Sequence, residues 1–422
     1  MQSAETIHTT IDHLFRHESG KMVSVLSRLL GLQNIETAQD IVQDTLLKAM
    51  NTWGYKGIPD NPSAWLYRVA KNKAIDFLRR QKKFQEISPQ YAYLVQSEYS
   101  LTSTVHNLFL ENEIQDSQLR MMFACCHPSI SEESQIALTL KTLCGLSINE
   151  ISKAFLTNEE TISKRIYRAR ERIQSEKIEL DVPDMDELPK RLDAVLKSLY
   201  LLFNEGYNSS HPEKLIREDL CEEAMRLCHL LTQHSLTAYP RSKALLSLMC
   251  FQSSRLNARL GDKGNIILLK YQDRNKWNRA LIQSGFNYLD EAAEPFEVSS
   301  YHFEAAIASL HAAAPSFEQT DWKSIYHLYE LLYKEQSSPV VAMNKAIASA
   351  YAVSKQNALA ELKEIKGLEK YYLYHTSIGD IYYELHNKQE AKRSYETALH
   401  LTTSQQEQQL LMSKIGSCET AQ

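Results

Sequence analysis

Two short stretches of the 422-residue chain concentrate positive charge. Residues 64–83 hold seven Lys or Arg side chains against one Asp, and residues 161–173 hold five against one Glu. Guanidinium and ammonium groups clustered on a helix bind nucleic-acid phosphates and the acceptor edge of guanine. The net charge of −5 conceals this pattern, because residues 179–422 carry 26 basic and 32 acidic side chains. The sequence therefore predicts two nucleic-acid-binding helices in its first half.

The second basic stretch lies in a predicted helix-turn-helix. Ser147 with Glu150, and Thr157 with Glu160, each form the Ser/Thr-x-x-Glu capping box that starts a helix, and only a tight turn fits between the two helices. At about 100° per residue, one face of the second helix collects Thr161, Lys164, Arg165, Arg168 and Arg172, and an adjacent face collects Ile162, Ile166, Ala169 and Ile173. Such a helix can bury one side and enter a major groove with the other. A solvated basic face on an ordinary helix is the alternative.

The first basic stretch belongs to a predicted helix over residues 61–83, with Asn61 as cap and Pro62 in the first turn. Its apolar stripe comprises Leu66, Val69, Ala70, Ala74, Phe77 and Leu78, and its polar side comprises Arg68, Lys71, Asn72, Arg79, Lys82 and Lys83. The aromatic residues nearby are Trp53, Tyr55, Trp65 and Tyr67. Stacking of an unpaired base on such a ring contributes about 1–3 kcal/mol. The alternative is that Trp65 and Tyr67 belong to the core.

Composition divides the chain. Residues 84–114 contain no Lys or Arg and are rich in Ser, Thr, Gln and Tyr, which is typical of a linker. A run of Asp and Pro from residue 181 to residue 189 marks a second boundary. We expect an all-α protein with domains at residues 1–84 and 115–178, a linker at 85–114, and a helical extension at 185–422. The Gly-rich turn within residues 255–270 predicts one short β-hairpin in that extension.

A repeat of about 33 residues lies near the C-terminus. Residues 339–370 align with residues 372–403, and the second copy has Gly379, Tyr382, Ala391, Tyr395 and Ala398 at the spacing of a tetratricopeptide repeat. The prediction is firm for this last copy and weaker upstream. The extension is therefore expected to be a tetratricopeptide-like solenoid.

Other classes of protein find little support. The sequence has no P-loop, dinucleotide-binding turn, GxSxG or HExxH motif, and His127, His211 and His302 stand alone, so we expect no enzyme. Seven cysteines without a CxxC pair favour a reducing compartment, here the cytoplasm, and a buried structural role for Cys125 and Cys126 over metal binding. No apolar run is long enough to span a membrane. No metal or cofactor is expected.

Several segments resemble a known family. AQDIVQDTLLKAM and PSAWLYRVAKNKAIDFLRR resemble region 2 of the extracytoplasmic-function (ECF) RNA polymerase sigma factors, of the sigma-70 family. The segment from DSQLRMMFACCHPS to SKRIYRARERI resembles their region 4, and VPDMDELPKRLDAVLKSLYLLFNEGY and ILLKYQDRNKWNRALI resemble the subgroup with a tetratricopeptide-like C-terminal extension. The resemblance spans essentially the whole chain.

The resemblance implies roles for matching residues. In the helix of residues 36–50, one face would turn to the core and comprises Ala38, Ile41, Val42, Thr45 and Ala49. On the opposite face, Asp40, Asp44 and Leu47 would dock on the coiled coil of the polymerase β′ subunit. Contacts to the −10 element would come from Asp60, Asn61, Ser63, Trp65, Arg68, Lys71, Asn72 and Arg79. Thr161, Lys164, Arg165, Arg168 and Arg172 would read the −35 element. The linker could thread a positively charged channel of the polymerase. In the extension, Asp273, Arg274 and Trp277 are a candidate regulatory contact to the sigma core or a ligand, although they could simply tie the expected hairpin to its neighbours.

The expected function is that of an alternative sigma factor. It would bind core RNA polymerase through the β′ and β subunits and direct promoter-specific initiation, while its extension regulates activity or binds a protein or a small molecule. A helix-turn-helix regulator with a repeat-type sensor domain is the alternative, but it leaves the helices of residues 36–83 without a role.

Overall fold

The computed structural model describes residues 4–80, 98–155, 157–209, 215–261, 264–294 and 297–419. Within these ranges the chain is built of helices and contains no β-sheet, which confirms the predicted all-α class. It divides into two compact units, Met1–Leu202 and Phe203–Gln422. None of the described helices combines the length and apolar character that a membrane crossing needs.

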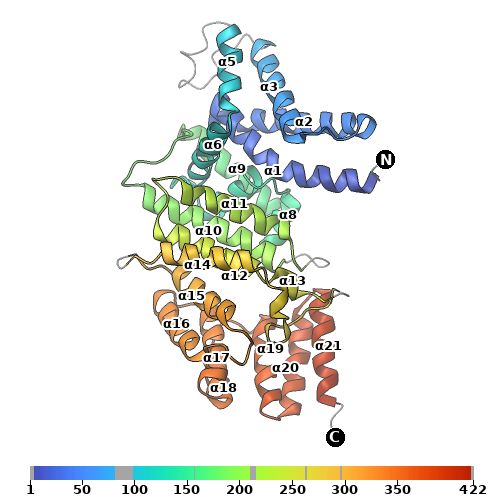
Figure 1. Ribbon diagram of the computed structural model, residues 1–422, viewed down its shortest axis with the longest axis vertical. Coiled ribbons are helices and arrows are strands. Elements are labelled where there is room, and N and C mark those ends of the chain that lie inside the picture. The colour runs from blue at the N-terminus through green and yellow to red at the C-terminus, as the bar shows by residue number, and fades with distance from the viewer. Residues whose placement is uncertain are drawn as a thin grey trace. The chain divides into compact units, whose positions relative to one another are not determined.

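The first unit packs its helices around α1 (Figure 1). Its α-helices are α1 (Ala4–Leu30), α2 (Ile35–Lys56), α3 (Pro62–Arg80), α5 (Glu98–Leu108), α6 (Glu111–Cys125), α7 (Glu132–Thr142), α8 (Ile148–Ala154), α9 (Glu159–Ser175) and the start of α10 (Leu188–Tyr207). Leu26, Trp53, Leu66 and Met122 are almost fully buried and place the core where α1, α2, α3 and α6 meet.

Two glycines fix the path of the chain around α2. After α1, Gly31 has a φ of 87°, and a short 3-10 helix, η1 (Leu32–Asn34), leads into α2. At the other end Gly57 has a φ of 80°, and its N–H donates to the Trp53 carbonyl at 3.0 Å. Other residues rarely adopt this left-handed conformation, which is common immediately after a helix. The loop of residues 57–61 therefore begins at a defined point.

The predicted linker is not uniformly irregular. Residues 98–108 of the segment form α5, whose Leu101 and Val105 are fully buried, and α6 already starts at Glu111. The polar composition hid this helix, because its few apolar residues fall on one face. Residues 81–97, including Lys82 and Lys83, lie outside the described part of the chain. The domain boundaries stay a prediction.

Cys125 and Cys126 are buried, as the sequence predicts. Burial raises the pKa of both thiols, to about 11 for Cys126, so neither is a ready nucleophile. Of the single histidines, His302 completes a capping box with Ser299 at the start of α15, whereas His211 lies outside the described residues. Across the described chain no three His, Cys, Asp or Glu side chains are grouped to hold a metal ion.

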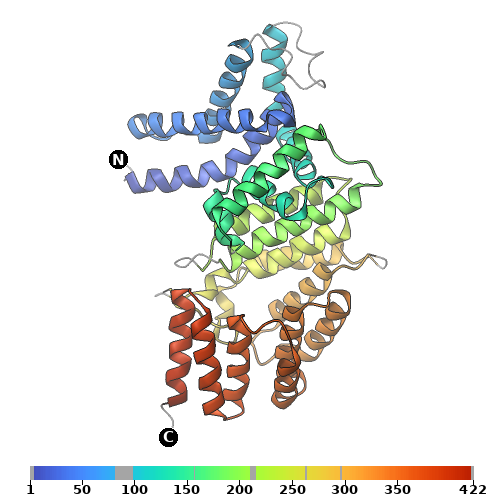
Figure 2. The same ribbon diagram turned by 180° about the vertical axis from the view of Figure 1, so that it is seen from behind.

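The second unit stacks consecutive helices side by side (Figures 1 and 2). Its α-helices after the end of α10 are α11 (Glu218–Gln233), α12 (Pro240–Ser253), α13 (Leu256–Arg259), α14 (Arg279–Glu291), α15 (Ser300–Ala313), α16 (Trp322–Glu335), α17 (Pro339–Ala352), α18 (Lys355–Glu364), α19 (Tyr372–Glu384), α20 (Lys388–Leu401) and α21 (Gln405–Glu419). Two 3-10 helices, η3 (Leu269–Tyr271) and η4 (Arg274–Lys276), join α13 to α14.

The predicted β-hairpin is not confirmed. Residues 256–259 form α13, and a single isolated antiparallel bridge joins Leu260 to Ile266. The Gly264 N–H donates to the Gly261 carbonyl at 2.8 Å, so the turn that the sequence indicated is present. One bridge does not make a ladder, because η3 begins only three residues beyond Ile266.

Each copy of the predicted repeat forms a helix pair, α17 with α18 and α19 with α20. Ala391, Tyr395 and Ala398 are buried in one cluster, and the Tyr395 ring lies against Gly379, where an added Cβ would sit 2.6 Å from it. A small residue is needed there for the two helices to approach. The tetratricopeptide type itself stays a prediction.

Candidate nucleic-acid interface

The outer face of α2 carries the residues predicted to bind polymerase. The opposite face is buried as expected and comprises Ala38, Ile41, Val42, Thr45 and Ala49. Asp40 and Asp44 are exposed, and Asp44 forms an ion pair with Lys73 of α3 at 3.0 Å. Leu47 has 57% of its surface exposed, and Met50, three residues further, has 38%. Acidic and apolar groups thus share one surface, and the sequence analysis missed Met50.

The loop before α3 presents Asp60 and Asn61 to solvent. Asn61 caps α3 as predicted, because its Oδ1 accepts the Ala64 N–H at 2.9 Å. Ser63 differs: its hydroxyl donates to Glu18 of α1 at 3.1 Å. The first two residues are open to a partner, whereas the Ser63 hydroxyl is engaged within the protein.

Glu18 of α1 accepts hydrogen bonds from the first turns of α3 and so holds the end of this loop in place. The sequence analysis did not single it out. The residue is 6% exposed and also accepts hydrogen bonds from Tyr67 and, at 3.3 Å, from Lys21. A buried carboxylate is tolerated when several donors surround it. The isolated Glu18 in α1 gave no periodic signal, since its partners lie about 45 residues away on α3.

The four aromatic residues separate into different roles. Trp53 is 1% exposed and belongs to the core, and Tyr67 is bonded to Glu18. Trp65 is half-buried with its ring edge-on to Trp53 at 5.4 Å, whereas Tyr55 is 94% exposed. Trp53 therefore belongs to the core. Trp65 and Tyr67, for which the core was the alternative, are both half-buried, and Trp65 and Tyr55 keep accessible ring surface.

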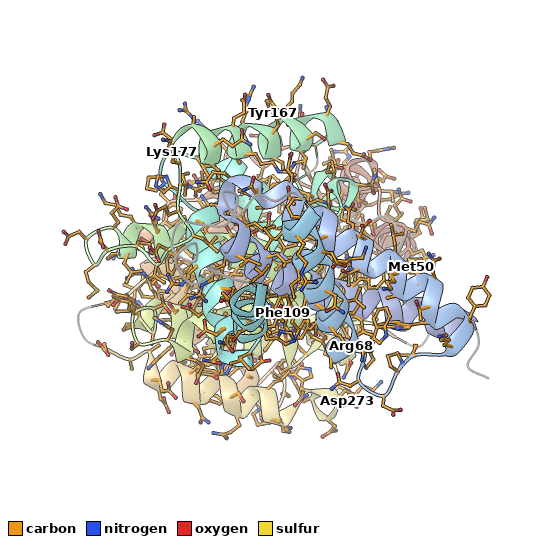
Figure 3. All side chains as sticks on the ribbon, turned by 90° about the horizontal axis from the view of Figure 1, so that it is seen from above. Met50, Arg68, Phe109, Tyr167, Lys177 and Asp273 are labelled. Atoms are coloured by element: carbon orange, nitrogen blue, oxygen red, sulfur yellow. The ribbon has the colours of Figure 1, made fainter. Side chains whose placement is uncertain are left out.

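Along α3, Arg68, Asn72 and Arg79 are exposed (Arg68 is labelled in Figure 3). Lys71 is half-buried, and its ammonium lies 5.6 Å from the centre of the Phe109 ring. Burial lowers the pKa of Lys71. Fewer positively charged side chains are thus fully exposed on α3 than the sequence suggested.

The helix-turn-helix is formed by α8 and α9. The Ser147–Glu150 capping box is confirmed, with the Glu150 N–H donating to Ser147 Oγ at 3.1 Å and the Ser147 N–H donating to Glu150 Oε2 at 2.8 Å. The second box is wrong by one residue: Asn158, not Thr157, caps α9, and its Oδ1 accepts the Thr161 N–H at 2.8 Å. Asn ranks above Thr as a cap, so residue type favoured Asn158, and the Thr-x-x-Glu spacing led to the wrong choice.

The buried stripe of α9 matches the prediction and comprises Ile162, Ile166, Ala169 and Ile173. On the other side Lys164, Arg168 and Arg172 are exposed and Thr161 is half-exposed. Figure 3 shows the side chains around Tyr167, itself 62% exposed, projecting outward from α9. This row of cations lies free of the protein core.

Two arginines of α9 are held by carboxylates of other helices. Arg165 pairs with Glu133 of α7 at 2.7 Å and is one-fifth exposed. Arg170 turns toward α2, where it pairs with Glu36 at 2.7 Å and donates to Gln39 at 2.6 Å. The cations of α9 are therefore of three kinds. Lys164, Arg168 and Arg172 are exposed, Arg165 is held by an ion pair, and Arg170 points toward α2.

In the extension, Asp273, Arg274 and Trp277 differ in their exposure to solvent. Asp273 is exposed and caps η4, its carboxylate accepting the Asn275 N–H at 2.9 Å. Trp277 is 4% exposed, and the Arg274 guanidinium stacks on it at 4.0 Å from the ring centre. Of these three residues, Arg274 and Trp277 face the interior of the second unit, whereas Asp273 faces solvent.

Comparison with known proteins follows the same division. A family model described as sigma-70 region 2 matches residues 14–84, and one described as sigma-70, region 4, matches residues 120–173. An ECF RNA polymerase sigma-E factor of Haemophilus influenzae is 30% identical over 165 residues, which are 37% of this chain and 80% of that protein. The chain belongs to the ECF sigma factors.

Other similarities extend this result. The ECF sigma factor SigW of Bacillus subtilis is 26% identical over 165 residues, 37% of this chain and 82% of SigW. An uncharacterized protein of Rhizobium meliloti is 34% identical over 378 residues, 89% of this chain and 88% of that protein, so this similarity includes the extension. Residues 191–293 match a family of unknown function (DUF6596). As an ECF sigma factor, the chain is a non-enzymatic initiation factor that binds core RNA polymerase and promoter DNA.

Proposed function

We propose that this ECF sigma factor uses three surfaces of its first unit for three separate tasks. The outer face of α2 binds the β′ subunit of the polymerase, the loop of residues 57–61 with α3 contacts the −10 element, and α9 reads the −35 element. The observation that carries this proposal is that each surface is exposed while the opposite side of its helix is buried. A helix held in this way presents its polar face with little loss of conformational entropy on binding.

The α2 surface suits a protein partner. Exposed Leu47 and Met50 follow Asp40 and Asp44 on the same helix, so an apolar patch lies beside charged groups. Protein interfaces commonly combine an apolar core with a polar rim. DNA would be repelled by Asp40 and Asp44, so this surface does not belong to the promoter contacts.

The two DNA surfaces suit different forms of DNA. The α9 cations stand on a helix of a helix-turn-helix, which fits the major groove of a duplex. The α3 cations lie on the helix that carries Trp65, whose half-buried ring can stack on an unpaired base. This combination is what melting at one promoter element and duplex recognition at the other require.

The experiment is capture of core RNA polymerase by the tagged full-length chain. We expect stoichiometric capture, because a sigma factor joins the enzyme whereas a helix-turn-helix regulator with a sensor domain binds DNA alone. Specific binding of promoter DNA without any association with core polymerase would favour the regulator and contradict the proposal.

We further propose that the extension regulates the first unit. A chain ending at Leu202 keeps every residue of the first compact unit, including the buried Leu192 and Leu199 of α10. Transcription by this truncated chain is expected to differ from that of the full chain in rate or promoter choice. Identical transcription by the two, with circular dichroism showing that the truncated chain is folded, would remove the regulatory role.

A further inference from the structure

A cavity of about 290 Å³ lies inside the second unit, lined from α12, α15, α16 and α17 and by residues flanking η4. The larger share of its lining is polar, and Leu248, Phe251 and Ile307 form an apolar part of the wall. Arg255, Trp277 and His311 also line it. Ligand cavities typically combine an apolar wall with a few convergent polar groups, and this volume lies at the lower end of their range.

Four polar atoms at this cavity are buried and have no hydrogen-bond partner among the described residues. Three belong to residues of the lining: Arg255 Nε, Trp277 Nε1 and His311 Nδ1. The fourth is Nη2 of Arg274, which is not part of the lining but stacks on Trp277. An unsatisfied buried donor costs about 1–3 kcal/mol, so proteins seldom leave several in one place. Their concentration around a single cavity points to a ligand that accepts hydrogen bonds.

The Trp277 and arginine groups are also alike in that they donate hydrogen bonds and cannot accept them. Trp277 presents an indole N–H, which can only donate, and the two guanidinium groups have donors and no acceptor. Arg255 and Arg274 lie 5.8 and 4.0 Å from the Trp277 ring centre, and no carboxylate of the described chain pairs with either guanidinium. The group that satisfies this set is an oxyanion.

Two neighbouring residues agree with this reading. Burial and the two guanidinium groups lower the pKa of His311 to about 3, so its ring is neutral, and its backbone carbonyl positions Arg274 through a 2.8 Å hydrogen bond. Glu304 is the acidic residue of the lining, and it already has an interaction of its own.

We propose that this cavity binds a small organic carboxylate, with the carboxylate against Trp277 and Arg255 and the apolar body against Phe251 and Ile307, while Arg274, stacked on Trp277, adds positive charge beside the site. The proposal names a ligand class for the regulatory extension, and it rests on that proposed role only for its effect on transcription. Binding is measured on the protein alone, so failure of the ligand site and failure of the promoter contacts are distinguishable.

The test is calorimetric titration of the full-length protein with benzoate, acetate and inorganic phosphate. We expect saturable binding of benzoate, weaker binding of acetate, which lacks the apolar body, and weaker binding of phosphate for the same reason. Absence of saturable benzoate binding at millimolar concentration would overturn the proposal. Phosphate binding as tight as benzoate binding would overturn the part that assigns an organic ligand.

Three variants test the geometry. Trp277→Phe keeps an aromatic six-membered ring and removes the pyrrole part of the indole with its N–H, and Arg274→Gln removes a guanidinium. Each is expected to weaken benzoate binding at least about tenfold, because hydrogen bonds to charged groups are strong. Lys276→Gln is the matched control on the same 3-10 helix, since Lys276 is exposed, and its affinity should not change.

The stability of the ligand-free protein separates a binding role from a merely structural one. Trp277→Phe removes a buried donor that has no partner but also opens a small void, because Trp277 is 4% exposed, so the melting temperature is expected to fall only slightly while the fold is kept. Unchanged benzoate affinity in both Trp277→Phe and Arg274→Gln would place the ligand elsewhere and defeat the proposal.

Discussion

Arg168→Ala removes an exposed guanidinium from α9 and leaves the buried stripe of that helix intact. If Arg168 contacts a base of the −35 element, its loss costs about 1–3 kcal/mol, which is a factor of about 5 to 150 in affinity. If it contacts only a phosphate, binding weakens uniformly across sequences, and the dependence of log affinity on log salt falls by about one unit.

Arg170→Ala is the matched control, because it removes the same type of side chain two residues away. Arg170 is turned toward Glu36 and Gln39 of α2, so its loss should leave promoter binding within about twofold, the effect of a surface ion pair on stability being about 0–1 kcal/mol. Glu133→Gln acts in the opposite direction. It frees Arg165 from its 2.7 Å ion pair and should raise promoter affinity up to about fivefold.

The assay is fluorescence anisotropy of a labelled promoter fragment with holoenzyme at two salt concentrations, the fragment being selected from a genomic library. Melting temperatures of the free variants establish that each is folded. Equal losses in Arg168→Ala and Arg170→Ala would show that α9 does not present the face described here. A lower affinity in Glu133→Gln would show that Arg165 does not reach DNA.

Three further predictions concern the polymerase surface and the two units. Asp40→Arg with Asp44→Arg should abolish capture of core polymerase without changing the melting temperature, because both residues are exposed, and retained capture would refute that surface. Asn158→Ala should destabilise the cap of α9 by about 1 kcal/mol in chemical denaturation; no change would mean that another residue caps the helix. Gly379→Ala should destabilise the second unit by about 1–3 kcal/mol, since its Cβ would meet a buried ring at 2.6 Å. Gly416→Ala lies within α21 and its Cβ meets nothing within 4 Å, so it should stabilise the unit by up to about 1 kcal/mol in the same measurement.

Much of the fold could be predicted because the local signals are strong. The buried faces of α2 and α9 match the helical spacing of their apolar residues one for one. The Ser147–Glu150 box and the Asn61 cap also hold, since each is satisfied by atoms within three residues along the chain. Periodicity and capping are local properties, and local properties can be read from a sequence.

The remaining features depend on contacts between distant residues. Ser63 was expected to face DNA, but its hydroxyl donates a hydrogen bond to Glu18 of α1. Arg170 belongs to a basic run in the sequence, but in the structure its side chain points toward α2 and pairs with Glu36. The side chain of Trp277 could be singled out in the sequence, but the cavity that it lines is formed by helices up to about 70 residues further along the chain. No periodicity encodes such partners.

In vitro transcription with purified chain, core RNA polymerase and a genomic promoter library tests the central claim most directly. The account predicts discrete transcripts that require the chain, share a −10 and a −35 element, and disappear with Asp40→Arg and Asp44→Arg. If core polymerase with this chain starts no specific transcript on any template, the two cationic helices do not act on one promoter and the account is contradicted.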